Sequence, residues 1–65
     1  MKFDDLKIGD YIVLIENIYK KRFLVTWINF QDKYVALSYI FKGKNMRPCR
    51  VLEADFNKEK WEFLR

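Results

Sequence analysis

The sequence predicts an all-β fold, a small antiparallel barrel or meander of five strands. Its apolar runs are about four to eight residues long and rich in Val, Ile, Tyr, Phe and Trp. Polar breaks recur roughly every ten residues, which is the spacing of a β-meander. The 65 residues leave room for one domain, residues 1–65, and no linker or internal repeat divides them.

The expected strands follow from the apolar runs in order. They lie within YIVLIE (11–16), FLVTWINF (23–30), YVALSYIF (34–41), RPCRVLEADF (47–56) and WEFLR (61–65). A short helical turn over 54–60, before the last strand, is the one helical candidate. Leu52, Phe56 and Phe63 recur there near helical spacing, and Asp55 or Asn57 supplies a cap.

Several of these strands are apolar on both faces. Strict alternation places Phe23, Val25 and Trp27 on one face of the second strand, with Leu24, Ile28 and Phe30 on the other. A flat sheet of this size covers only one face, so we expect the chain to curl into a barrel or to dimerise. Trp27 is predicted to be a core residue, whereas for Trp61 the sequence is compatible with either a core or a surface position.

The segment LKIGDYIVLI, residues 6–15, resembles the opening strand of SH3-like small barrels. In that family a Gly-Asp turn, here Gly9 and Asp10, precedes a hydrophobic first strand. The resemblance covers about ten residues. It implies an SH3-like barrel and carries no functional residue with it.

The composition argues against an enzyme. The chain has no histidine and a single cysteine, Cys49, so we expect no internal disulfide, no zinc site and no cofactor. Cys49 is predicted to be a small buried hydrophobe. The hydroxyl nucleophiles Thr26 and Ser38 lie within strands, and no Gly-rich phosphate loop is present. A toxin-type ribonuclease that uses Arg and Thr is the remaining enzymatic alternative.

No run approaches the ~20 apolar residues that cross a bilayer, and the first ten residues lack the apolar core of a secretory signal. We therefore expect a cytoplasmic protein in a reducing compartment with no membrane partner.

Positive charge is concentrated in the middle of the chain. The net charge is +4, but residues 20–50 alone carry a balance of +7, with Asp32 as their one acid. Residues 1–19 and 51–65 are mildly acidic. Such a distribution favours an anionic partner.

Turns of an antiparallel meander alternate between the two ends of the sheet. The turns at 17–22 and 42–45 then share one end, while 31–33 and 57–60 share the other with Asp10. The predicted binding residues are Lys20, Lys21, Arg22, Lys42, Lys44, Arg47, Arg50 and Tyr19. Arg47 and Arg50 flank Pro48 three residues apart, so on a regular strand they face opposite ways.

Two further aromatics lead into the second basic turn. Tyr39 and Phe41 are either stacking surfaces for bases or core residues that share the face of Val35 and Leu37. In the core interpretation, Tyr34 and Ser38 face outward.

Two functions remain open. The first is a basic module that contacts DNA or RNA through its Lys/Arg-rich turns, with little sequence specificity. The second is an accessory domain that binds, regulates or inhibits a larger partner or host protein, either by docking on an acidic partner or by pairing through an uncovered strand edge. Phe, Tyr, Met, Ile, Asn and Lys make up 31 of the 65 residues, a composition typical of AT-rich genomes such as those of some phages. A monomer and a homodimer are both compatible with either function.

Overall fold

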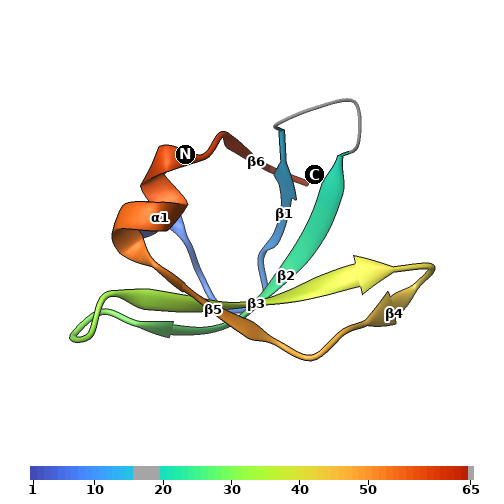
Figure 1. Cartoon of the computed structure of the whole chain (residues 1–65), viewed down its shortest axis with the longest axis horizontal. Coiled ribbons are helices and arrows are strands. Elements are labelled where there is room, and N and C mark those ends of the chain that lie inside the picture. The colour runs from blue at the N-terminus through green and yellow to red at the C-terminus, as the bar shows by residue number, and fades with distance from the viewer. Residues whose placement is uncertain (16–19, 65) are drawn as a thin grey trace.

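The structure is a computed structural model that describes residues 1–15 and 20–64. Its elements are the 3-10 helix η1 (Phe3–Asp5), strands β1 (Tyr11–Leu14), β2 (Lys21–Asn29), β3 (Tyr34–Phe41), β4 (Lys44–Asn45) and β5 (Cys49–Leu52), helix α1 (Glu53–Lys58) and strand β6 (Trp61–Phe63). The described strands pair antiparallel in one sheet (Figure 1). The all-β prediction is confirmed, and α1 is the short helix expected before the last strand.

The sheet is strongly curled but open. Its strand order is β4-β3-β2-β1-β6, and β5 pairs with β3 next to β4. No pairing among the described strands joins β6 to β4 or β5, so the predicted closed barrel is not confirmed. Helix α1 stands across the open side, between the end of β5 and the start of β6 (Figure 1).

The described residues form six strands where five were expected, because Lys44 and Asn45 of the predicted turn form β4 and the strand predicted within 47–56 is confined to β5. Met46, Arg47 and Pro48 separate β4 from β5, and Pro48 has no N–H to donate to a ladder. The Met46 N–H donates to the Tyr39 carbonyl at 2.7 Å, and the Ser38 hydroxyl donates to the Met46 carbonyl. This connection buries Ser38, whereas the interpretation of Tyr39 and Phe41 as core residues placed Ser38 outward.

One face of the sheet, which we call the inner face, packs on the core. It supplies Ile12, Val25, Ile28, Val35, Leu37 and Trp61. Three residues outside the sheet complete the core, namely Phe3, Leu6 and Phe56. Phe56 anchors α1, because its ring stacks on Trp61 with centroids 4.8 Å apart and planes 7° apart. The Trp61 indole N–H also donates to the Phe56 carbonyl at 3.0 Å.

A β-bulge in β2 overturns the prediction that Trp27 is a core residue. The register pairs Val25 with Leu37 but Trp27 with Ala36, so Thr26 is an extra residue. The Thr26 hydroxyl donates to the Ala36 carbonyl at 3.0 Å. Beyond the bulge, alternation is reversed: Ile28 enters the core and Trp27 is 53% exposed on the opposite, outer face. Cys49, on edge strand β5, is likewise exposed and not buried.

The turn between β3 and β4 requires two left-handed residues. Lys42 has φ 50° and Gly43 has φ 77°, the signs of a type I′ hairpin turn. We expect Gly43→Ala to lower the free energy of unfolding by about 1 kcal/mol, because only backbone strain opposes it. A Cβ at Gly43 meets nothing within 4 Å. Urea denaturation measures the loss, and Gly43→Asn is the control, since asparagine tolerates this conformation. A loss no larger for alanine than for asparagine would contradict the assignment.

Candidate nucleic-acid interface

The strand register brings four of the predicted cations to one end of the sheet. Arg22 pairs with Ile40, which pairs with Asn45 on its other side, and Phe41 pairs with Lys44. Lys21 precedes Arg22, and Lys42 lies in the adjoining turn. Lys20 is exposed just before β2, and we call this set, Lys20, Lys21, Arg22, Lys42 and Lys44, the basic end. Predicted residue Tyr19 lies outside the described residues.

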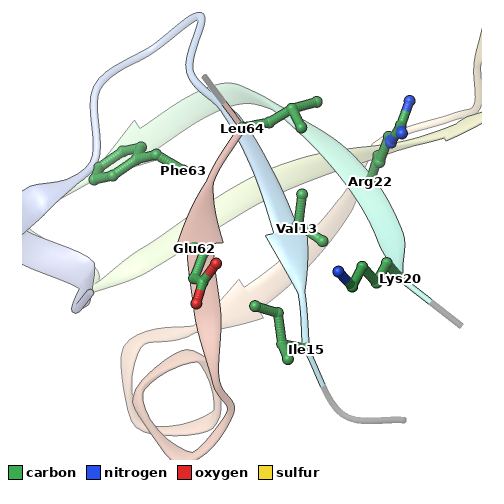
Figure 2. A pocket seen from close by; sticks show the side chains of 7 residues that line it. All are labelled: Val13, Ile15, Lys20, Arg22, Glu62, Phe63 and Leu64. Carbon is green, nitrogen blue, oxygen red and sulfur yellow. The ribbon is translucent and has the colours of Figure 1, made fainter. Parts of the chain in front are cut away.

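The basic end is divided between the two faces of the sheet. Cross-strand partners share a face, so Lys44 lies with Phe41 on the inner face. Lys21 lies there too, opposite Leu14, whereas Arg22 lies opposite Val13 on the outer face. Lys20 and Arg22 help to line a pocket of about 260 Å³ (Figure 2). Its other lining residues are Val13, Ile15, Glu62, Phe63 and Leu64.

Arg47 and Arg50 do not join the basic end. Arg47 is exposed in the connection between β4 and β5. Arg50 pairs with Ala36, four residues along β3 from Ile40. At about 3.3 Å per residue, the separation along the strand is about 13 Å. Of the predicted binding residues, the structure therefore brings together only those at the start of β2 and around the β3–β4 turn.

A row of aromatic rings connects the core to the basic end. From the stacked pair of Phe56 and Trp61, it continues through Phe23, Tyr39 and Phe41. The centroid distances along these steps are 5.5 Å, 5.5 Å and 6.0 Å. Exposure rises along the row, from 0% at Phe56 and 6% at Trp61 to 49% at Phe41. Phe41 therefore shares the inner face with the core, but half of its surface is open to solvent.

The Phe41 ring is in contact with a lysine ammonium group. The Lys42 Nζ lies 5.4 Å from the centroid of the Phe41 ring, within cation–π range. Lys44 flanks the same ring as its cross-strand partner. An aromatic surface bordered by lysines is suited to a base that stacks on the ring while its phosphates contact the ammonium groups.

Carboxylates are absent from the strands that form this surface. None of β2, β3, β4 and β5 contains Asp or Glu. Between the residues that the structure describes, the one ion pair is Lys58 with Asp55 at 3.8 Å, between exposed side chains. No described acid therefore neutralises the lysines around Phe41 by direct pairing.

The start of β6 corrects the predicted charge layout. Trp61 pairs with Leu14, and the Ile15 N–H donates to the Lys60 carbonyl at 2.8 Å. Residues 59–60 thus lie at the same end of the sheet as the start of β2, not with Asp10. The reason is α1, which carries the chain from one end of the sheet to the other between β5 and β6. The prediction from alternating turns assumed a turn at this point and did not include a helix that crosses from one end of the sheet to the other.

The described residues form neither a metal-binding cluster nor a membrane-spanning helix. Across residues 1–15 and 20–64, no group of three or more His, Cys, Asp or Glu side chains is arranged to hold a metal ion. Within the same ranges, no helix has both the length and the apolar character needed to cross a membrane. Comparison of the chain with protein-family models, curated proteins and solved structures finds no match in any of the three.

Proposed function

We propose that this chain is a single-stranded nucleic-acid-binding module with little sequence specificity. The observation that carries the proposal is the half-exposed Phe41 ring, bordered by Lys42 and Lys44 on a surface without a described carboxylate. In this proposal Phe41, with Tyr39 beside it, stacks on one or two bases. The lysines of the basic end then contact the phosphates on either side.

A preference for single strands follows from the stacking. Bases in a duplex already stack on one another, so the Phe41 ring reaches a base face only where the strand is unpaired. Phosphate contacts alone do not make this distinction, because both forms carry them. Stacking also favours no particular base strongly, since every base offers a π-face.

The test is a salt titration of binding to dye-labelled oligo-dT and to a mixed-sequence duplex of equal length, read by fluorescence anisotropy. With three or four phosphates neutralised and a slope of about −0.7 per contact, affinity for oligo-dT falls about 20- to 50-fold from 50 to 200 mM salt. Phe41→Ala is expected to lose most of the preference for oligo-dT while keeping the salt slope. Absence of binding at low salt, or a binding constant indifferent to salt, would refute the proposal.

We further propose that the curled sheet is a variant of the SH3-like small barrel. Its support is the predicted Gly-Asp turn, in which Gly9 has φ 96° and its N–H donates to the Val25 carbonyl at 2.8 Å. The Asp10 side chain accepts from the Lys7 N–H at 2.8 Å. The hydrophobic strand β1 follows directly, as the resemblance implies.

A further inference from the structure

The outer face of the sheet carries a second surface that is separate from the basic end. Its centre is a row across three strands, because Trp27 pairs with Ala36 and Ala36 pairs with Arg50. The next row adds Tyr34 and Leu52. Trp27 is 53% exposed within β2 and Leu52, the last residue of β5, is 56% exposed, so two large apolar side chains lie open to solvent on this face. We call these five residues the outer patch.

The positive charge of the outer patch, on Arg50, is positioned by the ring of Tyr34. The Arg50 guanidinium lies 4.8 Å from the centroid of the Tyr34 ring, a cation–π contact. Stacking on a ring occupies a guanidinium face and leaves its N–H groups at the edge available. These groups match a carboxylate in two parallel hydrogen bonds. Among the described residues no carboxylate lies within 4.0 Å of Arg50.

The outer patch thus combines an exposed indole, an exposed aliphatic side chain and a preorganised guanidinium. Trp and Arg are the residues that most often dominate protein–protein binding energy. The patch carries positive charge without acid, since β2, β3 and β5 contain no Asp or Glu. Charge complementarity therefore favours an acidic occupant over a second copy of this chain, which has a net charge of +4.

We propose that the outer patch binds an extended acidic segment of a partner protein. The segment places an apolar side chain on Trp27 and Leu52 and a carboxylate on Arg50. Trp27 and Arg50 lie on strands two spacings apart, about 10 Å, with the small Ala36 between them. Alternate side chains of an extended peptide are about 7 Å apart, a span that these two long side chains bridge. The partner motif is thus an apolar and an acidic residue separated by one residue.

The two tryptophans provide a direct test by NMR on the full chain. The Trp61 indole N–H is bonded to the Phe56 carbonyl inside the core, whereas the Trp27 indole is exposed. We expect a capped peptide of repeating Leu-Ser-Glu-Ser to shift the Trp27 indole signal and leave that of Trp61 unchanged. The same peptide with Gln for Glu should bind about tenfold more weakly, because it lacks the carboxylate.

Variants separate the outer patch from the basic end. Arg50→Gln is expected to reduce the affinity for the Glu peptide about tenfold and to leave the Gln peptide unaffected. Lys7→Gln removes an exposed positive charge elsewhere and should leave both affinities unchanged. Lys42→Gln with Lys44→Gln impairs oligonucleotide binding under the proposed function but should not change peptide binding, so the two proposals fail independently.

Three results would overturn this inference. The first is equal binding of the Glu and Gln peptides, which removes the role of Arg50. The second is a Trp27 shift caused by oligo-dT at lower concentration than by the peptide, which assigns the outer patch to nucleic acid. The third is a Trp27 shift on simple concentration of the protein, with a matching rise in light scattering, which assigns it to a second copy.

Discussion

Lys42→Glu combined with Lys44→Glu is expected to reduce oligo-dT affinity at least about 30-fold, the largest functional effect of any pair in the chain. The estimate assigns about 1 kcal/mol or more to each charge-assisted phosphate contact. Both side chains border the half-exposed Phe41 ring, Lys42 through its cation–π contact and Lys44 as the cross-strand partner. Reversal therefore replaces attraction with repulsion at the point where the strand is expected to stack.

The binding constant of this double variant should also depend less steeply on salt. Removing two phosphate contacts lowers the slope of log K against log salt by about 1.4 for single-stranded nucleic acid. Lys7→Glu with Lys33→Glu is the matched control. It makes the same change in net charge, from +4 to 0, but away from the basic end: Lys7 precedes β1, and Lys33 lies in the turn between β2 and β3. An equal loss in the control would mean that net charge alone drives binding and would refute a localised interface.

Phe56→Ala is expected to destabilise the domain by about 3–5 kcal/mol, the largest effect on stability. A 65-residue domain has a total free energy of unfolding of roughly 3–10 kcal/mol, so the variant should lose a large fraction of its stability and unfold at a much lower urea concentration. Phe56 has no exposed surface, and its ring stacks on Trp61. Its loss removes the contact that fastens α1 to the start of β6.

The matched control for this prediction is Phe41→Ala, which deletes the same side chain at a position that is 49% exposed. We expect Phe41→Ala to cost about 1 kcal/mol or less, since its ring is only half buried. Urea denaturation followed by far-UV circular dichroism measures both. Similar losses at the two positions would contradict the gradient of burial along the aromatic row.

The strands and the main turn could be predicted from local patterns alone. The apolar runs predicted the strands, and the KGKN break predicted the turn at Lys42 and Gly43. Because alternate turns of a meander share an end, the grouping of Lys21, Arg22, Lys42 and Lys44 followed from strand order without any contact information. Phe56 and its neighbours similarly predicted the short helix.

The features that could not be predicted depend on the strand register and on contacts between segments that are distant in the sequence. A bulge at Thr26 leaves no trace in the periodicity of β2, so strict alternation places Trp27 on the wrong face and does not predict the outer patch. Ser38 is buried by a connection eight residues later. Similarly, the direction of β6 depends on how far α1 carries the chain, which residue spacing does not encode.

The bulge at Thr26 reverses the alternation of side chains within β2. Before the bulge, Phe23 and Val25 face the core and the even-numbered residues face outward; after it, even-numbered Ile28 faces the core and odd-numbered Trp27 faces outward. The bulge therefore decides which large side chain enters the core. If β2 kept all its residues but paired regularly, Thr26 would lie opposite Ala36, and the Trp27 indole would lie opposite Val35, where Ile28 packs. The outer patch and the core are two products of the same inserted residue.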